Sequence, residues 1–456
     1  MRTSPPDLPG SANSDSPLDR ALALLLAGER EAALRWSAAV VKQDASVPSA
    51  LILTCRLLAD SGRTEAAIEG FELGIKRAID SGNLPLAVAA VGDLRTLGAD
   101  VGKMLDEIAA AFCLGSPRLA EVAAPPPPPL PSHSGFQPLS SFLTGPALLS
   151  KVTEIVHEAS TEYETVADSE PPLVSPLPLF SYLEREGLRA LIECFEMFTV
   201  PAGKEVIREG EEGAEAYIVA RGELEVRRGT QSPNEPSDDV TLARLTNGAL
   251  FGEMALLSRA PRAASVFACR PSILLMARRD ALEAVAEKRP EIGVELAAHC
   301  RRRMVANLVR TSKVLLAVDP SERPALVERF ETRVFEKGEK LIEEGKESSG
   351  LHLVASGEVA VIGHEEAGEP FVIKTLGPGD VVGEVALVLR RDANADVVAV
   401  HPTVTLHLAR EEFESLIRAH PAILHGLYIL AIERDDETSS VLATSTWSVA
   451  DEDVLL

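Results

Sequence analysis

The chain has 456 residues, of which 46% are hydrophobic and 4% aromatic, and its formal net charge is −24. That length suffices for about three domains of ordinary size, and the negative charge disfavours nucleic acid and anionic membrane surfaces as general partners. No run of about 18 apolar residues occurs, so no membrane span is predicted. Residues 1–16 lack the features of a signal peptide and are expected to be a disordered leader.

The five cysteines form no C-x-x-C pair and are expected to be reduced thiols in the cytoplasm.

Residues 17–115 carry apolar residues at helical spacing, interrupted by glycines that could separate successive helices. The pattern recurs at one fixed spacing, since Gly28 corresponds to Gly62 and Ala33 to Ala67. This spacing resembles the period of tetratricopeptide repeats, clearly in two copies and in distorted form in a third around residues 84–97. Such helices stack in pairs and usually bind proteins. The alternative is a short helical bundle that packs on itself or dimerises the chain.

Residues 116–176 are expected to be a linker, because the run AAPPPPPLP at residues 123–131 can form neither a helix nor a central strand. One short helix is predicted inside it, at residues 146–160, and an acidic stretch follows. The proline run is interpreted as a spacer, with docking into an aromatic-lined groove as the alternative.

A second internal repeat begins near residue 177. Gly203 and Gly338 correspond to each other, as do Glu253 and Glu384, and the first pair is spaced slightly further apart because the first copy has a longer loop. Short runs of alternating apolar residues, bounded by glycines, predict jelly-roll barrels of antiparallel strands.

The repeat predicts two domains, domain A at residues 177–315 and domain B at residues 316–440, followed by an acidic tail at 441–456. Each barrel is followed by a pair of helices that a proline separates, Pro290 in the first copy and Pro421 in the second. The fold class is therefore multidomain α and β: a helical repeat module, a Pro-rich linker and two jelly-roll barrels with flanking helices.

The first cassette, residues 251–266 (FGEMALLSRAPRAASV), is predicted to hold a small phosphate and a sugar. Glu253 accepts hydrogen bonds from sugar hydroxyls once it is ionised. Arg262 presents a rigid fork of donors that suits a phosphate diester. The first N–H groups of a helical turn, and residues without bulk, favour an anion held close to the backbone. Gly252, Ala263 and Ala264 are these residues without bulk, and Met254 and Ala255 begin the expected turn.

The first cassette resembles the phosphate-binding cassette of cyclic nucleotide-binding domains, as found in protein kinase A regulatory subunits and catabolite activator proteins. The family pattern is F-G-E-x-A-L and, about five residues later, R-x-A-[S/T]. The resemblance implies that Glu253 binds the ribose 2′-hydroxyl and that Arg262 binds the cyclic phosphate. It also implies backbone contacts from Gly252, Met254, Ala255, Ala263 and Ala264, and it adds Ser265 at the hydroxyl position of the pattern. Ala263, in place of a threonine, favours cAMP over cGMP as the ligand, and Val314 and Leu315 are candidates for an apolar lid over the base.

The second cassette, residues 382–399 (VGEVALVLRRDANADVVA), departs from that pattern. It keeps Gly383 and Glu384, but the position of the phosphate-binding arginine holds Ala393. Losing a guanidinium–phosphate pair costs roughly 2–5 kcal/mol of affinity, and Asp396 would repel an anion. Domain B is therefore expected to be a degenerate site that binds cyclic nucleotide weakly or not at all.

Other motifs are missing from the sequence. His352 stands alone in its predicted strand, and no H-x-H metal motif, P-loop or nucleophile elbow occurs, so neither a metal site nor an enzyme is predicted. No helix-turn-helix follows either barrel, and the linker has no R-R-x-[S/A] segment. These observations argue against a transcription factor and against a kinase regulatory subunit. The basic turn Arg301–Arg303 is expected to be a solvated face.

Two functions follow from these features. The first is a cytoplasmic cyclic-nucleotide receptor without catalytic activity and without a cofactor, which passes the ligand signal to an unknown protein partner through its helical repeats. The second is a scaffold that binds no ligand, in which the barrels and repeats serve only as interaction modules.

Overall fold

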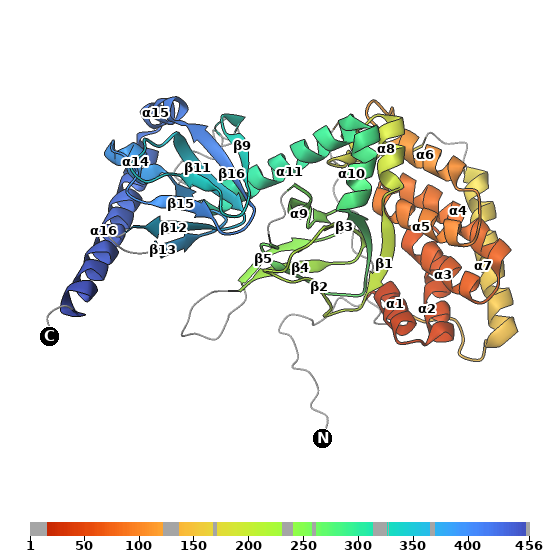
Figure 1. Ribbon diagram of the computed structural model, residues 1–456. Helices are drawn as coiled ribbons and strands as arrows, with labels where there is room; N and C mark the ends of the chain where they lie inside the picture. The colour runs from red at the N-terminus through yellow and green to blue at the C-terminus, as the bar shows by residue number, and fades with distance from the viewer. Residues whose placement is uncertain are drawn as a thin grey trace, which may run out of the picture. The chain divides into compact units, whose positions relative to one another are not determined.

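The structure is a computed structural model that describes residues 16–121, 136–166, 171–229, 240–257, 261–312, 326, 328–364 and 370–452, with the backbone alone from residue 439 onwards. The chain forms two compact units (Figure 1). The first contains the described parts of Met1–Arg208, Glu215–Phe251 and Ala264–Glu295, and the second those of Glu209–Ala214, Gly252–Ala263 and Leu296–Leu456. Residues 1–15 of the predicted leader and the lid candidates Val314 and Leu315 lie outside the described residues, while Ser16 is the N-cap of the first helix.

The first unit begins with helices, as their apolar spacing predicts. They are α1 (Pro17–Leu26), α2 (Arg30–Gln43), α3 (Pro48–Asp60), α4 (Thr64–Asp80), α5 (Leu84–Thr96) and α6 (Gly102–Phe112). Each packs against the next in the chain, and alanines such as Ala33 and Ala67 are fully buried where two helices approach closely. The helical fold of this region is confirmed, while its classification as tetratricopeptide repeats stays a prediction.

Helix α7 (Gly145–Val166) covers the helix predicted at residues 146–160 and is longer at both ends. It packs against α2, α3 and α4, with Val152 and Val156 fully buried. This part of the segment predicted to be a linker therefore contributes to the helical core. The proline run itself lies outside the described residues.

Barrel A, the eight strands of the first unit, follows a short helical entry. This entry consists of η1 (Phe180–Tyr182) and α8 (Arg185–Ile192). The strands are β1 (Glu196–Val200), β2 (Glu205–Ile207), β3 (Glu215–Arg221), β4 (Leu224–Arg228), β5 (Val240–Leu245), β6 (Leu250–Phe251), β7 (Ser265–Ala268) and β8 (Ser272–Arg278). They form two antiparallel four-stranded sheets, with strand orders β1-β8-β3-β6 and β2-β7-β4-β5. Side chains from both sheets, among them Val219, Leu224 and Leu274, fill one core between them.

Helix α10 (Arg279–Lys288) follows β8, and α11 (Pro290–Thr311) begins at Pro290, as predicted for a proline that separates two helices.

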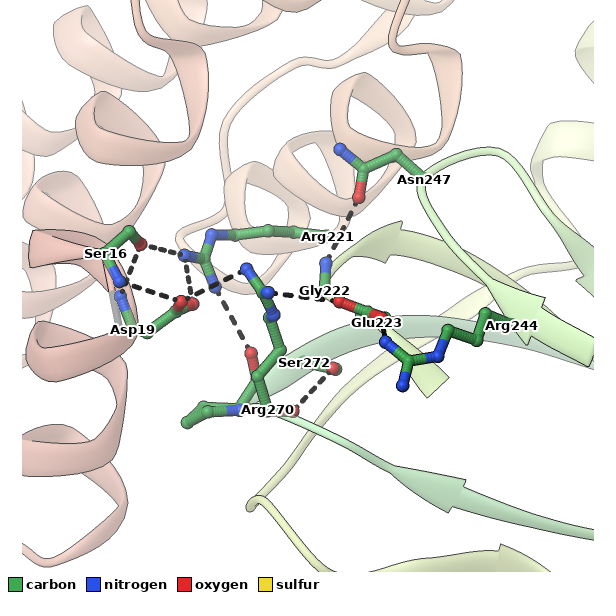
Figure 2. A network of polar contacts seen from close by, with 10 residues as sticks. Ser16, Asp19, Arg221, Gly222, Glu223, Arg244, Asn247, Arg270 and Ser272 are labelled. Carbon is green, nitrogen blue, oxygen red and sulfur yellow. Dashed lines mark hydrogen bonds and ion pairs between the residues drawn. The ribbon is translucent and has the colours of Figure 1, made fainter. Parts of the chain in front are cut away.

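A polar network joins α1 to barrel A within the first unit (Figure 2). The Asp19 carboxylate, 2% exposed, accepts hydrogen bonds from Arg221 at 2.6 Å and Arg270 at 3.4 Å. Glu223 continues the network by accepting from Arg270 at 3.1 Å and from Arg244 at 2.9 Å. A carboxylate buried this deeply is stable only while its cationic partners are present. The network therefore ties the position of the first helix to the β3–β4 turn.

The β3–β4 turn itself requires a glycine. Gly222 has φ +126°, and a Cβ at this position would overlap the side chain of Ser272. The absence of a side chain lets the strand carrying Ser272 pass directly beside the turn. As a result Arg221 and Glu223, on either side of the glycine, both reach the network (Figure 2).

Barrel B, in the second unit, repeats this architecture. Its strands are β9 (Glu331–Phe335), β10 (Lys340–Ile342), β11 (Gly350–Ser356), β12 (Val359–Gly363), β13 (Phe371–Leu376), β14 (Val381–Val382), β15 (Asp396–Ala399) and β16 (Thr403–Ala409). The sheet orders are β14-β11-β16-β9 and β10-β15-β12-β13. The flanking helices are α14 (Glu384–Leu389), α15 (Arg410–Ala419) and α16 (Pro421–Glu452), and α16 starts at the predicted proline. It continues as a helix through most of the segment treated as a tail, and Figure 1 shows it running past β12, β13 and α14.

Candidate functional site

The guanidinium of Arg262 is directed inward, and the side chain is 9% exposed. Its Nη1 donates a hydrogen bond to the Gly252 carbonyl oxygen at 2.8 Å. The guanidinium lies so close to Gly213 that a Cβ there would overlap it. The backbone of Arg262 is also anchored, since its N–H donates to Glu211 and its carbonyl accepts from Gly210, both at 2.9 Å. The guanidinium of Arg262 is therefore fixed in position by the backbone around Gly252 and Gly213.

The carboxylate of Glu253 is also buried, with the residue 4% exposed. It accepts a hydrogen bond at 3.2 Å from Nε of Arg303, a residue of α11, and the two side chains form an ion pair. Cys300, one turn earlier on α11, lies with its Sγ 3.7 Å from the Glu253 carbonyl oxygen, and burial raises the pKa of this thiol to about 12. The residue predicted to bind the ribose is thus linked directly to the helix that follows the barrel.

The remaining predicted residues of the first cassette lie next to these two in the chain: Gly252, Met254 and Ala255 beside Glu253, and Ala263, Ala264 and Ser265 directly after Arg262. Gly252 has φ +74°, which favours glycine, and α9 (Met254–Leu257) forms the single helical turn predicted after it. Met254 is half-buried, and the side chain of Ala255 is outside the description. Ala263 is exposed, Ala264 is half-buried, and Ser265 is the half-buried first residue of β7.

In the second cassette, the backbone around Ala393 reproduces that around Arg262. The N–H of Ala393 donates to Lys346 at 3.0 Å and its carbonyl accepts from Gly345 at 2.8 Å. Arg262 makes the same two hydrogen bonds with the equivalent residues of the first copy, Glu211 and Gly210. The prediction that Ala393 occupies the arginine position is consistent with this geometry. Its methyl group is buried among apolar residues such as Ile342 and Val397.

Glu384, the counterpart of Glu253, is 1% exposed and is also paired with an arginine of the following helix. Oε1 of Glu384 accepts a hydrogen bond from Nη1 of Arg434, on α16, at 2.5 Å. Burial raises the pKa of the Glu384 carboxyl, and the positive charge of Arg434 opposes that rise. Each cassette carboxylate is therefore closed by a guanidinium from the helix that follows its barrel.

Sequence reasoning missed these two arginines. It placed Arg303 in a solvated basic turn, whereas Arg303 binds the cassette carboxylate and Arg301 donates to the hydroxyl of Thr332 at 2.8 Å. The repeat held the signal, because Arg303 and Arg434 are spaced along the chain just as Glu253 and Glu384 are.

No helix within the described ranges is long and apolar enough to cross a membrane. Across the same residues, no group of three or more histidine, cysteine, aspartate and glutamate side chains is arranged to bind a metal ion.

Comparison with known proteins identifies the two barrels. The model of the cyclic nucleotide-binding domain family matches residues 197–289 and 332–420, so the chain carries two such domains in tandem. It is similar to cAMP-dependent protein kinase regulatory subunits of Yarrowia lipolytica (30% identity; 52% of this chain and 58% of the relative) and Hypocrea atroviridis (29%; 58% and 56%). The chain thus spans just over half the length of these curated relatives.

Among solved structures, the regulatory domain of Toxoplasma gondii PKA with cAMP matches at 26% identity over 56% of this chain and 92% of that one, with a TM-score of 0.28. The absence of an R-R-x-[S/A] segment from the linker therefore does not separate this chain from kinase regulatory subunits, since such subunits are among its relatives.

Proposed function

We propose that this protein is a receptor for a cyclic nucleotide, with cAMP as the ligand, and that it acts on a protein partner and catalyses no reaction itself. The observation that carries the proposal is the position of the Arg262 guanidinium, which is bonded to the Gly252 carbonyl and lies against Gly213, where there is no side chain to displace it. The buried Glu253 belongs to the same cassette. A fixed guanidinium and a buried carboxylate suit the phosphate and the ribose of one small ligand.

Ligand binding would act on α11 through Arg303. The ribose hydroxyl needs an acceptor oxygen of Glu253, and Arg303 already occupies one of them. The ligand therefore changes the environment of Arg303. If two conformations of the protein differ in the position of α11, the one with the higher ligand affinity becomes more populated when the ligand binds. By linkage, a partner that prefers one arrangement of α11 would change the affinity for the ligand by the same factor.

The names of the relatives support a kinase catalytic subunit as the class of protein partner. The helical part of the first unit offers a second protein-binding surface, as expected of stacked helical repeats. The net charge of −24 disfavours nucleic acid and anionic membranes. A cytoplasmic location is consistent with five free cysteines.

A scaffold without ligand is the second candidate, and the closed state of both carboxylates favours it. Glu253 pairs with Arg303 and Glu384 with Arg434 within the folded chain. If these ion pairs never open, the barrels would only present surfaces to partners.

Titration calorimetry with cAMP and cGMP separates the two candidates. We expect one tight cAMP site per chain, weaker cGMP binding, and a loss of affinity of roughly 2–5 kcal/mol in Arg262→Ala. Arg208→Ala, whose side chain is 63% exposed, is the matched control and should bind as the wild type does. No detectable heat with either nucleotide would establish the scaffold and refute the receptor.

A further inference from the structure

Barrel B has a cavity of about 60 Å³ beside the second cassette. Most of its wall is apolar, and polar side chains enter it from the cassette and from α16. The apolar lining includes Ile342, Val361, Ile373, Leu376, Val382 and Val397. The polar lining consists of Glu384, Asn394, Arg434, Glu437, Thr438 and Lys374. A mostly apolar hollow with a few convergent polar groups is the usual form of a small-molecule site.

One atom in this wall lacks a partner. Oε2 of Glu384 is buried and makes no hydrogen bond, although Oε1 of the same carboxylate is bound to Arg434. A buried acceptor left without a donor costs about 1–3 kcal/mol. About 10–15 Å³ of such open space is enough to hold one water, so the cavity has room for a small donor group beside this oxygen. The carboxylate is therefore prepared to accept a hydroxyl or N–H from a ligand.

The charges that line the cavity compensate each other. Arg434 is paired with Glu384, and Lys374 with Glu437 at 3.0 Å. At the position where the first cassette has Arg262, the second offers the methyl group of Ala393. A phosphate entering here would meet no guanidinium at the place where the first cassette provides one.

The nearby arginine of the second cassette is engaged elsewhere. Arg391 is paired with Asp435 on α16, and the amide of Asn394 donates to the same carboxylate at 2.8 Å. These contacts, with those of Arg434 and Lys374, tie α16 to the cassette and to β13 at three points. The part of α16 around Arg434 that borders the cavity is thus held by polar contacts, whereas earlier turns of the same helix, with Ile423 and Leu427, are packed in the core of barrel B.

We propose that barrel B is a site for an uncharged, hydroxyl-bearing ligand of the nucleoside class, which binds as α16 moves away from the cassette. The second cassette keeps a carboxylate that can bind a sugar hydroxyl, but it has no arginine at the position that binds a phosphate in the first cassette. The ligand that matches these groups and the apolar wall is therefore a sugar joined to an apolar ring. A nucleoside is larger than the present cavity, so its entry must displace side chains of α16. Binding and the release of α16 are therefore one event.

Titration calorimetry on the full chain with adenosine and guanosine tests this proposal. The Arg262→Ala variant is the background, because it disables the first cassette for phosphates. We expect one nucleoside site per chain that Arg262→Ala leaves unchanged, that cAMP does not displace, and that Glu384→Gln weakens at least tenfold. Hydrogen exchange of the α16 amides around Arg434 should become faster when the nucleoside is present.

A second variant protects the test against misfolding of Glu384→Gln. Ala393→Val adds apolar volume at the cavity wall without placing a charge in it, and it should abolish nucleoside binding while the chain stays folded. The proposal is overturned if neither nucleoside binds at millimolar concentration, if Ala393→Val binds as the wild type does, or if cAMP displaces the nucleoside in the Arg262→Ala background. These results leave the receptor function of the first cassette untouched, because cAMP binding by the wild-type chain tests that separately.

Discussion

Replacing Asp19 with alanine should detach the first helix from barrel A. Asp19 is 2% exposed, and its partner Arg221 lies 2.6 Å away with a side chain that is 11% exposed (Figure 2). The substitution leaves the Arg221 guanidinium buried without its carboxylate and removes one partner of Arg270. It acts on the contact between two parts of the first unit and leaves the apolar core of each part unchanged.

The expected cost follows from burial. Removing one member of a buried ion pair destabilises a protein by about 3–5 kcal/mol, because the remaining charge keeps its desolvation penalty. Asp19 also caps α1, since its side chain accepts from the Ser16 N–H at 3.2 Å and its own N–H donates to Ser16 Oγ at 3.2 Å. Loss of such a cap costs about 1 kcal/mol. Ser16→Ala removes this cap together with the hydrogen bond that Ser16 Oγ accepts from Arg221 at 3.4 Å, so it gives an upper limit for the contribution of the cap.

Urea unfolding, followed by the fluorescence of Trp36 on α2 in a Trp447→Phe background, gives the free energy of unfolding of this unit. The matched control is Asp106→Ala, because Asp106 and Arg189 are also 2.6 Å apart but are 44% and 34% exposed. An exposed pair contributes about 0–1 kcal/mol. If Asp19→Ala and Asp106→Ala destabilise the protein equally, the argument that burial makes this network strong is wrong.

Two further predictions concern the second unit. Gly213→Ala should weaken cAMP binding at least tenfold, about 1.4 kcal/mol, because its Cβ would push the Arg262 guanidinium away. Gly377→Ala is the control in the same calorimetric titration, since its Cβ would meet nothing within 4 Å, and equal affinities would contradict the placement of Arg262. His352 is 1% exposed, and burial lowers its pKa to about 3. The unfolded chain therefore binds a proton that the folded chain does not, and stability falls as pH drops from about 6.5, by about 2 kcal/mol at about pH 5. The midpoints of urea unfolding at about pH 6.5 and about pH 5 should lie closer together for His352→Leu than for the wild type. An unchanged difference would assign the pH effect to other groups.

Much of the fold could be predicted because the signals are local. The spacing of apolar residues predicts the helices of the first unit, and the starts of α11 and α16 coincide with Pro290 and Pro421 because proline cannot continue a preceding helix. The internal repeat predicts two barrels, since the same glycines and strands recur in both copies. The domain boundaries were harder to predict. Helix α7 looks like an isolated amphipathic segment in the sequence, and only its packing shows that it belongs to the helical core.

The motif and the repeat predict which chemical groups each cassette offers, a carboxylate in both and a guanidinium in one. What those groups contact follows from the packing of the folded chain. Arg303 and Arg434 reach their carboxylates across about 50 residues of chain, and His352, alone in its strand, faces His407 on β16 with ring centroids 4.5 Å apart. Periodicity and motifs record relations between residues close in the sequence, whereas pairings across the chain depend on how the strands and helices pack.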